Sequence, residues 1–274
     1  MKGSLVSKKT ITELSGARVL ITGASKGIGA AMAHAFASAG ANVALAARSH
    51  DVLHGMAERL GGSAHEIDLA DGAQLDGFIA RVEAEVGPID VLVNNAGAET
   101  SSLIDRATEA DISAVIALNL VAPERLIRQV LPGMLAREKG HIVSVSSLAG
   151  VLAVPGTSVY SSTKAGLSHF MAVVERDLKA TPIGTTLVEP GPVSTEMWDR
   201  FIEDPTVAAA VRRGQRLQLF PSTTPETIAH ATVDAVAKGK AHVRFPKRLM
   251  VQFLLENAPR RLGDLALLGL RPQR

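Results

Sequence analysis

The chain has 274 residues, 46% apolar and 20% charged, a composition typical of one large globular domain rather than a disordered or fibrous protein. It contains no cysteine, which excludes disulfides, cysteine-ligated zinc, iron–sulfur clusters and thiol nucleophiles. The net charge is +2, with nine Lys or Arg against two acidic residues in 238–274, but aromatic residues make up only 3% and offer little to stack on bases. No nucleic-acid partner is therefore predicted.

Short apolar runs that favour β-strands alternate along the chain with longer segments of helical periodicity. The predicted strands are 18–21, 42–46, 64–67, 90–93, 141–145 and 185–188, and the predicted helices are 27–39, 52–60, 74–86, 110–136 and 158–180. This βαβ alternation predicts an α/β fold, a doubly wound (Rossmann) parallel sheet with helices on both faces. We expect one domain, residues 1–245, and a basic, leucine-rich C-terminal extension, residues 246–274.

The opening MKGSLVSKKTITELSG lacks the apolar core of a secretory signal. No run is long and apolar enough to span a bilayer as a helix. A cytoplasmic location is therefore expected.

A glycine-rich turn, residues 22–29, joins the first strand to the first helix. Glycines there let the backbone turn tightly and approach a phosphate, and the helix N-terminus that follows offers unpaired N–H groups and a positive dipole end. A flexible loop is the alternative, but the strand before the turn and the helix after it favour a dinucleotide-binding site.

The residue after the second strand indicates which dinucleotide binds. Arg48 follows that strand at the position where the adenosine ribose of a dinucleotide would lie. An acidic residue there would bind a free 2′-hydroxyl, whereas a cation prefers the 2′-phosphate of NADP. Lys26, within the glycine-rich turn, can add a second positive charge. Both could instead be solvated surface residues, but together they favour NADP over NAD.

Tyr160 is the only tyrosine, and Lys164 follows it at the start of a predicted helix. Residues four apart share a helix face, so the ammonium can lie near the phenol oxygen, where it would stabilise the phenolate and lower its pKa. Ser147 ends a predicted strand on the carboxyl edge, and its hydroxyl could donate to a carbonyl oxygen or simply terminate the strand. Asn119 lies in an apolar helix, where its amide needs a partner whether its role is structural or catalytic.

Together these residues resemble the short-chain dehydrogenase/reductase family. The resemblance runs over about residues 14–240. It rests on a TGxxxGxG turn (Thr22, Gly23, Gly27, Gly29), an NNAG segment (Asn94, Asn95, Ala96, Gly97), the helix residue Asn119, the Ser147, Tyr160 and Lys164 set, and a PGxVxT segment (Pro190, Gly191, Val193, Thr195).

The resemblance implies a catalytic set in which Tyr160 exchanges a proton with the substrate oxygen while hydride passes between substrate and nicotinamide. Lys164 would lower the Tyr160 pKa and hold the nicotinamide ribose, Ser147 would steady the substrate oxygen, and Asn119 would order a water that relays protons. The implied cofactor is NADP, and no metal site is predicted. The implied cofactor contacts are Gly23, Ser25, Lys26, Gly27, Ile28, Gly29, Arg48, Asp68, Leu69, Asn95, Ala96, Gly97, Tyr160, Lys164, Pro190, Gly191, Val193 and Thr195.

Apolar side chains near these positions predict a pocket for a small lipophilic ketone or alcohol. They are Leu148, Val151, Leu152, Val154, Met197, Trp198, Phe201 and Phe220. Two other functions stay open: a ketoacyl-thioester reductase whose basic tail docks an acidic carrier, and a non-catalytic NADP-binding scaffold.

The C-terminal extension is predicted either to cover the core or an interface of a homodimer or homotetramer, or to act as a lid or a peripheral membrane contact for an oily substrate. Pro259 should break any helix in it.

Overall fold

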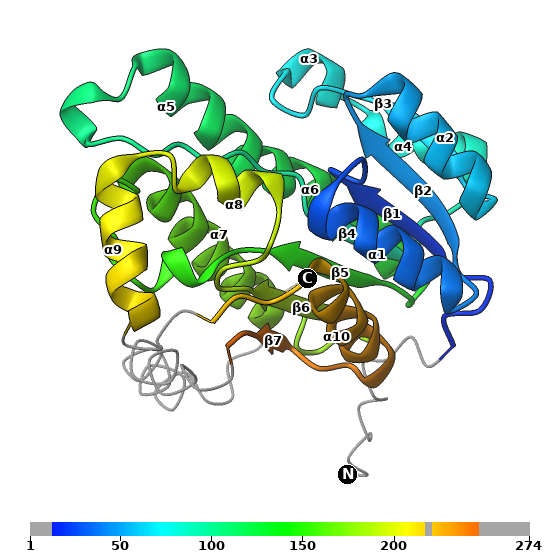
Figure 1. Ribbon diagram of the computed structural model, residues 1–274. Helices are drawn as coiled ribbons and strands as arrows, with labels where there is room; N and C mark the ends of the chain where they lie inside the picture. Colours follow the sequence, from blue (N-terminus) through cyan, green and yellow to red (C-terminus); the bar gives the residue numbers. More distant parts are fainter. Residues whose placement is uncertain (1–12, 217–220, 247–274) are drawn as a thin grey trace, which may run out of the picture.

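The computed structural model describes residues 13–216 and 221–246. Its centre is one sheet of seven strands in the order β3-β2-β1-β4-β5-β6-β7, and every neighbouring pair is parallel. The strands are β1 (Arg18–Thr22), β2 (Asn42–Ala47), β3 (Ser63–Glu66), β4 (Val91–Asn94), β5 (His141–Val145), β6 (Gly184–Glu189) and β7 (His242–Arg244). The predicted fold class is confirmed (Figure 1).

Helices cover both faces of the sheet. On one face lie α1 (Gly27–Ser38), α2 (His50–Leu60) and α10 (Pro225–Lys238), and on the other lie α3 (Gly72–Leu75), α4 (Phe78–Val86), α6 (Ala122–Ala136) and α7 (Ser158–Asp177). Successive strand residues point to opposite faces. Val19 and Ile21 of β1 therefore pack with α1, whereas Leu20 packs in the other core.

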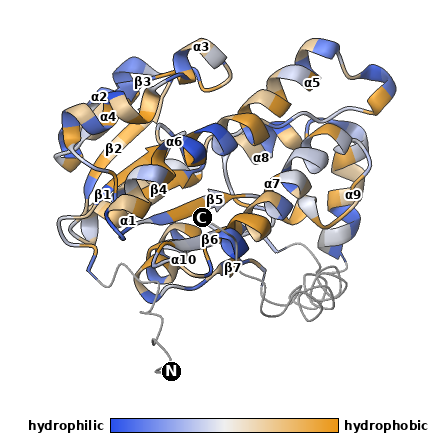
Figure 2. Ribbon diagram, turned by 180° about the vertical axis from the view of Figure 1, so that it is seen from behind, coloured by the Kyte–Doolittle hydropathy of each residue, from blue (hydrophilic) through white to orange (hydrophobic). Residues whose placement is uncertain are grey.

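Most of the sheet is hydrophobic in Figure 2, and Val91, Leu92 and Val93 of β4 are fully buried. A strand buried on both faces needs a continuous apolar run instead of an alternating pattern. The two cores together hold the sheet between its helical layers.

The chain reverses direction across the sheet next to β1. It first runs through β2 and β3 on one side of β1, and then returns to place β4 on the other side. In such a sheet the crevice outside the carboxyl ends of the strands, at this reversal, is where ligands bind. The loops that follow β1, β2, β4, β5 and β6 all open toward this edge.

Several elements differ from the sequence-based prediction. The predicted helix 74–86 is divided into α3 and α4 at Gly77, whose φ of +64° is left-handed. The predicted helix 110–136 is α5 (Glu109–Ile116), a π-helical segment η2 (Ala117–Val121) and α6, which follow one another without a gap. Short 3₁₀ turns lie at η1 (Ile104–Arg106) and η3 (Leu148–Gly150).

Four elements were not predicted: α8 (Glu196–Phe201), α9 (Pro205–Arg216), α10 and β7. β7 has only three residues and α8 only six, too few for a periodic pattern. α10 carried usable signals, because Thr224 caps its N-terminus by accepting from the Thr227 amide and Pro225 follows in its first turn.

The predicted C-terminal extension lies outside the described residues except for Pro246. Within residues 13–216 and 221–246, none of the helices combines the length and apolar character needed to cross a membrane.

Candidate active site

A cavity of about 360 Å³ opens at the carboxyl ends of the strands, beside the reversal at β1. Loops distant in sequence meet there, and nearly all the predicted site residues line it. The predicted residues in its wall are Gly23, Ser25, Lys26, Gly27, Ile28, Arg48, Asp68, Leu69, Asn95, Ala96, Gly97, Ser147, Tyr160, Lys164, Pro190, Gly191, Val193 and Thr195. Gly29 and Asn119 do not line the cavity. Gly29 packs against Gly23, and Asn119 is hydrogen-bonded to the loop after Gly97.

The glycine-rich turn leaves no room for side chains at two of its positions. Gly23 has φ +64°, and a Cβ there would lie 2.8 Å from the Cα of Ala96. A Cβ at Gly29 would overlap the carbonyl oxygen of Gly23. The turn therefore packs directly against the loop after β4. No side chain from these glycines covers the backbone before α1, so its N–H groups can approach a pyrophosphate in the cavity.

Asn95 fastens the loop after β4 to the glycine-rich turn. Its side-chain amide donates to the carbonyl oxygens of Thr22 (2.9 Å) and Gly23 (3.2 Å). The Thr22 hydroxyl donates to Val93 and accepts from the backbone amides of Asn95 and Ala96. The two loops that form the cofactor end of the cavity are thus one hydrogen-bonded unit.

Tyr160 lies in the first turn of α7 and faces the cavity, partly buried. The surrounding protein raises the pKa of its phenol by desolvation, a hydrogen bond with Ser147 lowers it, and the nearby charge of Glu99 raises it. The net pKa is above the usual value, so the predicted net lowering of the Tyr160 pKa is wrong for this structure. Desolvation is the largest cause of the shift, and the Lys164 nitrogen lies 5.8 Å from the centre of the ring.

Lys164 lies one turn further along α7 and is only 4% exposed. Its ammonium donates to the carbonyl oxygen of Val145, the last residue of β5, at 3.0 Å. Burial lowers its pKa to about 8. The prediction that Tyr160 and Lys164 lie close together on one face of the helix is confirmed.

Asn119 lies in the π-helical segment η2 and is 1% exposed. Its amide donates to the carbonyl oxygen of Ala98 (2.8 Å) and accepts from the Ala98 amide (2.9 Å), and it also donates to the Thr163 hydroxyl. The side chain therefore fixes the loop after Gly97. Gly97 itself is close to the candidate catalytic lysine, because a Cβ added to it would lie 3.5 Å from the Lys164 nitrogen. π-helical turns within α-helices often mark functional sites.

The substrate side of the cavity is apolar. Six of the eight predicted side chains line it: Leu148, Leu152, Val154, Met197, Trp198 and Phe201. Val151 packs against Leu148 instead, and Phe220 lies outside the described residues. The Phe201 ring meets the Tyr160 ring edge-on at 5.5 Å and stacks with Trp198 at 5.9 Å. The short helix α8 thus places its aromatic face over the candidate catalytic tyrosine.

An ion pair at the cavity wall was not predicted. Glu99, whose side chain is 10% exposed, accepts a 2.7 Å hydrogen bond from Arg200 of α8. Arg200 also pairs with Glu196, which in turn pairs with Lys26 at 2.6 Å. Charged side chains therefore interrupt the apolar lining that was predicted for the pocket. The position of Glu99 two residues after the NNAG segment, in the loop that follows β4, was a usable signal.

The candidate ribose end of the cavity lies between β2 and β3. Arg48 and Ser49 follow β2, and Asp68 and Leu69 follow β3. The Arg48 guanidinium is exposed and forms no ion pair with any residue in the described part of the chain. Lys26, the second predicted cation, already has the carboxylate of Glu196 as its partner.

Comparison with known proteins identifies the family and the fold. A family model described as short chain dehydrogenase matches residues 17–206. The chain belongs to the short-chain dehydrogenase/reductase family. It is therefore an oxidoreductase that uses a nicotinamide cofactor, as the resemblance implied.

Relatives in this family differ in substrate and cofactor. Ketoacyl reductase HetN from Nostoc sp. is 36% identical over 231 residues, covering 82% of this chain and 77% of the relative. A short-chain dehydrogenase from Sphingobium yanoikuyae in complex with NADPH has a TM-score of 0.78 at 28% identity, covering 94% of this chain and 98% of that one. A family member from Burkholderia phymatum in complex with NAD shares the fold, with a TM-score of 0.77 at 23% identity over 96% of this chain and 98% of that one.

Proposed function

We propose that this short-chain dehydrogenase/reductase uses NADP(H) to interconvert a lipophilic ketone and its secondary alcohol. The observation that carries the proposal is the position of Tyr160. Its phenol faces the cavity, contacts Ser147 and lies beneath the aromatic side chains of α8. A proton-transfer group in an apolar cavity suits an uncharged carbonyl substrate.

Four side chains divide the work. Tyr160 donates its phenol proton to the ketone oxygen during reduction and takes it back during oxidation. Ser147 lies within hydrogen-bond reach of Tyr160; with substrate bound, it turns its single hydroxyl proton to the ketone oxygen and holds that oxygen in place. Lys164 is a buried cation that stabilises the phenolate left behind, and Asn119 holds the loop after Gly97 in position. The nicotinamide, when bound, supplies or accepts the hydride.

The cavity fits a dinucleotide at the end formed by the glycine-rich turn. Gly23 and Gly29 have no space for side chains, so the backbone is open to a pyrophosphate at the start of α1. Arg48 would meet a 2′-phosphate after β2, and Lys26 would join it by releasing the exposed carboxylate of Glu196, which favours NADP over NAD. The Asp68 and Leu69 pair lies beside them for the adenine.

The charges beside the catalytic groups support an uncharged substrate. Glu99 is held against the cavity wall by Arg200, and its carboxylate would repel a negatively charged substrate close to Tyr160. The same cavity is also lined by Leu148, Leu152 and Val154. An aliphatic or polycyclic ketone meets both requirements.

A ketoacyl-thioester reductase is the second candidate, favoured by the similarity to HetN. One screen separates the candidates: the full chain is mixed with NADPH and a panel of aliphatic, polycyclic and ketoacyl-thioester substrates, and NADPH consumption is followed. Turnover of the free ketones is the expected result. Turnover of thioesters alone would favour the second candidate, and no turnover of any substrate would favour a non-catalytic scaffold.

Three further expectations stay predictions: a homodimer or homotetramer, a cytoplasmic location, and a lid, interface or membrane contact at residues 246–274. The basic residues of that segment, among them Lys247 and Arg248, suit either an anionic surface or the rim of an interface.

A further inference from the structure

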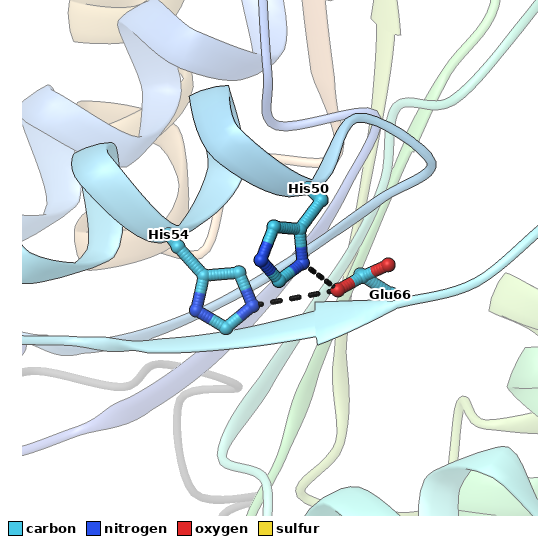
Figure 3. A group of neighbouring side chains, drawn as sticks. All are labelled: His50, His54 and Glu66. Atoms are coloured by element: carbon cyan, nitrogen blue, oxygen red, sulfur yellow. Dashed lines mark hydrogen bonds and ion pairs between the residues drawn. The ribbon is translucent and has the colours of Figure 1, made fainter.

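Two histidines and one glutamate lie together on the surface where α2 meets the edge strand β3 (Figure 3). His50 and His54 are one turn apart on α2, and their ring centroids are 4.3 Å apart. Glu66 is the last residue of β3; its Oε1 is hydrogen-bonded to Nδ1 of His50 and lies 3.6 Å from Nε2 of His54. Donor atoms of the three side chains all lie within 4.8 Å of one another.

Neither packing nor the proposed function explains why these groups converge. The three side chains are 61%, 50% and 48% exposed, so no surrounding core forces them together. Within residues 13–216 and 221–246, no other group of three or more His, Asp or Glu residues brings its donor atoms this close. The negative charge of Asp51 also acts on His50 and adds to the potential that attracts a cation.

We propose that His50, His54 and Glu66 bind a divalent transition-metal ion such as Zn²⁺. Imidazole nitrogens and a carboxylate oxygen are ligands that zinc accepts, at about 2.0–2.2 Å in tetrahedral geometry. Tetrahedral ligands at these bond lengths lie about 3.3 Å from one another, a spacing that exposed side chains reach with small rotations. Three protein ligands leave the fourth position for water. Sites for Mg²⁺ and Ca²⁺ consist of oxygen ligands, so these ions suit the cluster poorly.

The site joins two elements that the backbone connects only through a loop. His50 and His54 come from α2 and Glu66 from β3, one of the two edge strands of the sheet. A bound ion would hold the edge strand to its covering helix, and a ligand that binds only the folded chain raises its stability by mass action. Because this inference does not depend on the proposed function, it can be tested without any substrate.

The test is isothermal titration calorimetry of Zn²⁺ into the full chain, carrying no histidine tag and freed of metal with a chelator. Binding of one ion per chain and a rise in melting temperature with Zn²⁺, but not with Mg²⁺, are expected. Loss of an outer-shell partner of a metal ligand typically costs about 10- to 100-fold in affinity. His54→Ala and Glu66→Gln each remove a ligand, so each should weaken Zn²⁺ binding at least about tenfold.

The matched control is His34→Ala, which removes an exposed histidine on α1 and should leave Zn²⁺ affinity unchanged. Melting curves recorded without metal establish whether each variant folds. If one of the two ligand variants does not fold, the other still tests the proposal. The proposal is overturned if the wild-type chain binds no Zn²⁺, or if His54→Ala and Glu66→Gln bind it with wild-type affinity and stoichiometry.

Discussion

The Lys164 ammonium donates a 3.0 Å hydrogen bond to the carbonyl oxygen of Val145, at the carboxyl end of β5. This bond holds a buried cation at the base of the cavity, 5.8 Å from the centre of the Tyr160 ring. The backbone of Lys164 is held as well, because its carbonyl oxygen accepts from the Ser146 hydroxyl at 2.8 Å. The end of β5 and the first turns of α7 are therefore one unit, which carries Ser147 just after β5 and Tyr160 in the first turn of α7.

Lys164→Met should lose turnover and cofactor affinity without loss of stability. Methionine fills similar space but cannot donate a hydrogen bond, and a charge-assisted hydrogen bond contributes about 1.5–3 kcal/mol. We expect about 10- to 100-fold weaker NADPH binding, measured by fluorescence titration. The melting temperature should hold or rise, since the buried charge is removed. Lys179→Met, on an exposed lysine just after α7, is the control; equal losses in both variants would contradict the role of Lys164.

Glu99→Gln should lower the pKa of Tyr160, because the Glu99 carboxylate raises it. Arg200, left with Glu196 as its remaining carboxylate partner, would act in the same direction. Ketone reduction needs the protonated phenol, so its fall in kcat/KM at alkaline pH should begin at lower pH in the variant. Alcohol oxidation needs the phenolate, so its rising limb should also move to lower pH. The control Glu226→Gln should leave the pH profiles of reduction and oxidation unshifted. Unshifted profiles in Glu99→Gln as well would exclude an effect of Glu99 on the Tyr160 pKa.

Arg48→Asp should reverse or abolish the preference for NADPH over NADH. The substitution replaces an exposed cation at the end of β2 with an acid that repels a 2′-phosphate and accepts from a free 2′-hydroxyl. The lost interaction corresponds to about 1.5–3 kcal/mol, or roughly 10- to 100-fold in the ratio of kcat/KM values. Arg106→Asp changes an exposed arginine of η1, outside the cavity wall, and should leave the ratio unchanged. Equal efficiency with both cofactors in the wild-type enzyme would contradict this assignment.

His141 should make the protein lose stability in mild acid. Its ring is fully buried on β5, and burial lowers its pKa to about 4. The Thr186 hydroxyl donates its proton to the backbone carbonyl oxygen of Lys240. Nε2 of His141 must therefore be the donor in its 2.8 Å hydrogen bond to the Thr186 oxygen. Nδ1 has no partner among the described residues, and a second proton there would have no acceptor.

The sign of this effect follows from the two pKa values. The unfolded chain takes up the proton near pH 6.5 and the folded chain only near 4, so stability is full above pH 6.5 and falls as the pH drops toward 4. The loss amounts to about 3 kcal/mol. In His141→Gln, which keeps a donor for Thr186, urea unfolding should depend less on pH over this range. A slope as steep as that of the exposed-site control His230→Gln would contradict the prediction.

Local patterns predicted the parts of the site that lie close together in sequence. The glycine-rich turn lies between a strand and a helix, and Tyr160 and Lys164 are one turn apart, so short-range spacing was enough to place them. The fold class followed for the same reason, because each βα unit carries its own apolar period.

Contacts between distant segments were not predictable in this way. Arg200 reaches Glu99 across 101 positions, and Phe201 reaches Tyr160 from a helix too short to show a period. The predicted direction of the Tyr160 pKa shift was wrong. Spacing along the chain reveals a neighbouring lysine, but it does not reveal how much protein excludes water from the phenol. The convergence of His54 with Glu66 depends on how α2 packs beside the edge strand, which no spacing along the chain specifies.

The role of Tyr160 is tested most directly by the rate of NADPH oxidation in Tyr160→Phe, measured with a ketone that the wild-type enzyme reduces. Phenylalanine keeps the ring that packs 5.5 Å from Phe201 and removes only the hydroxyl that transfers the proton. We predict a fall in kcat of about 10²- to 10⁴-fold, with an unchanged melting temperature and an NADPH dissociation constant close to that of the wild type. Turnover at the wild-type rate would contradict proton transfer by Tyr160.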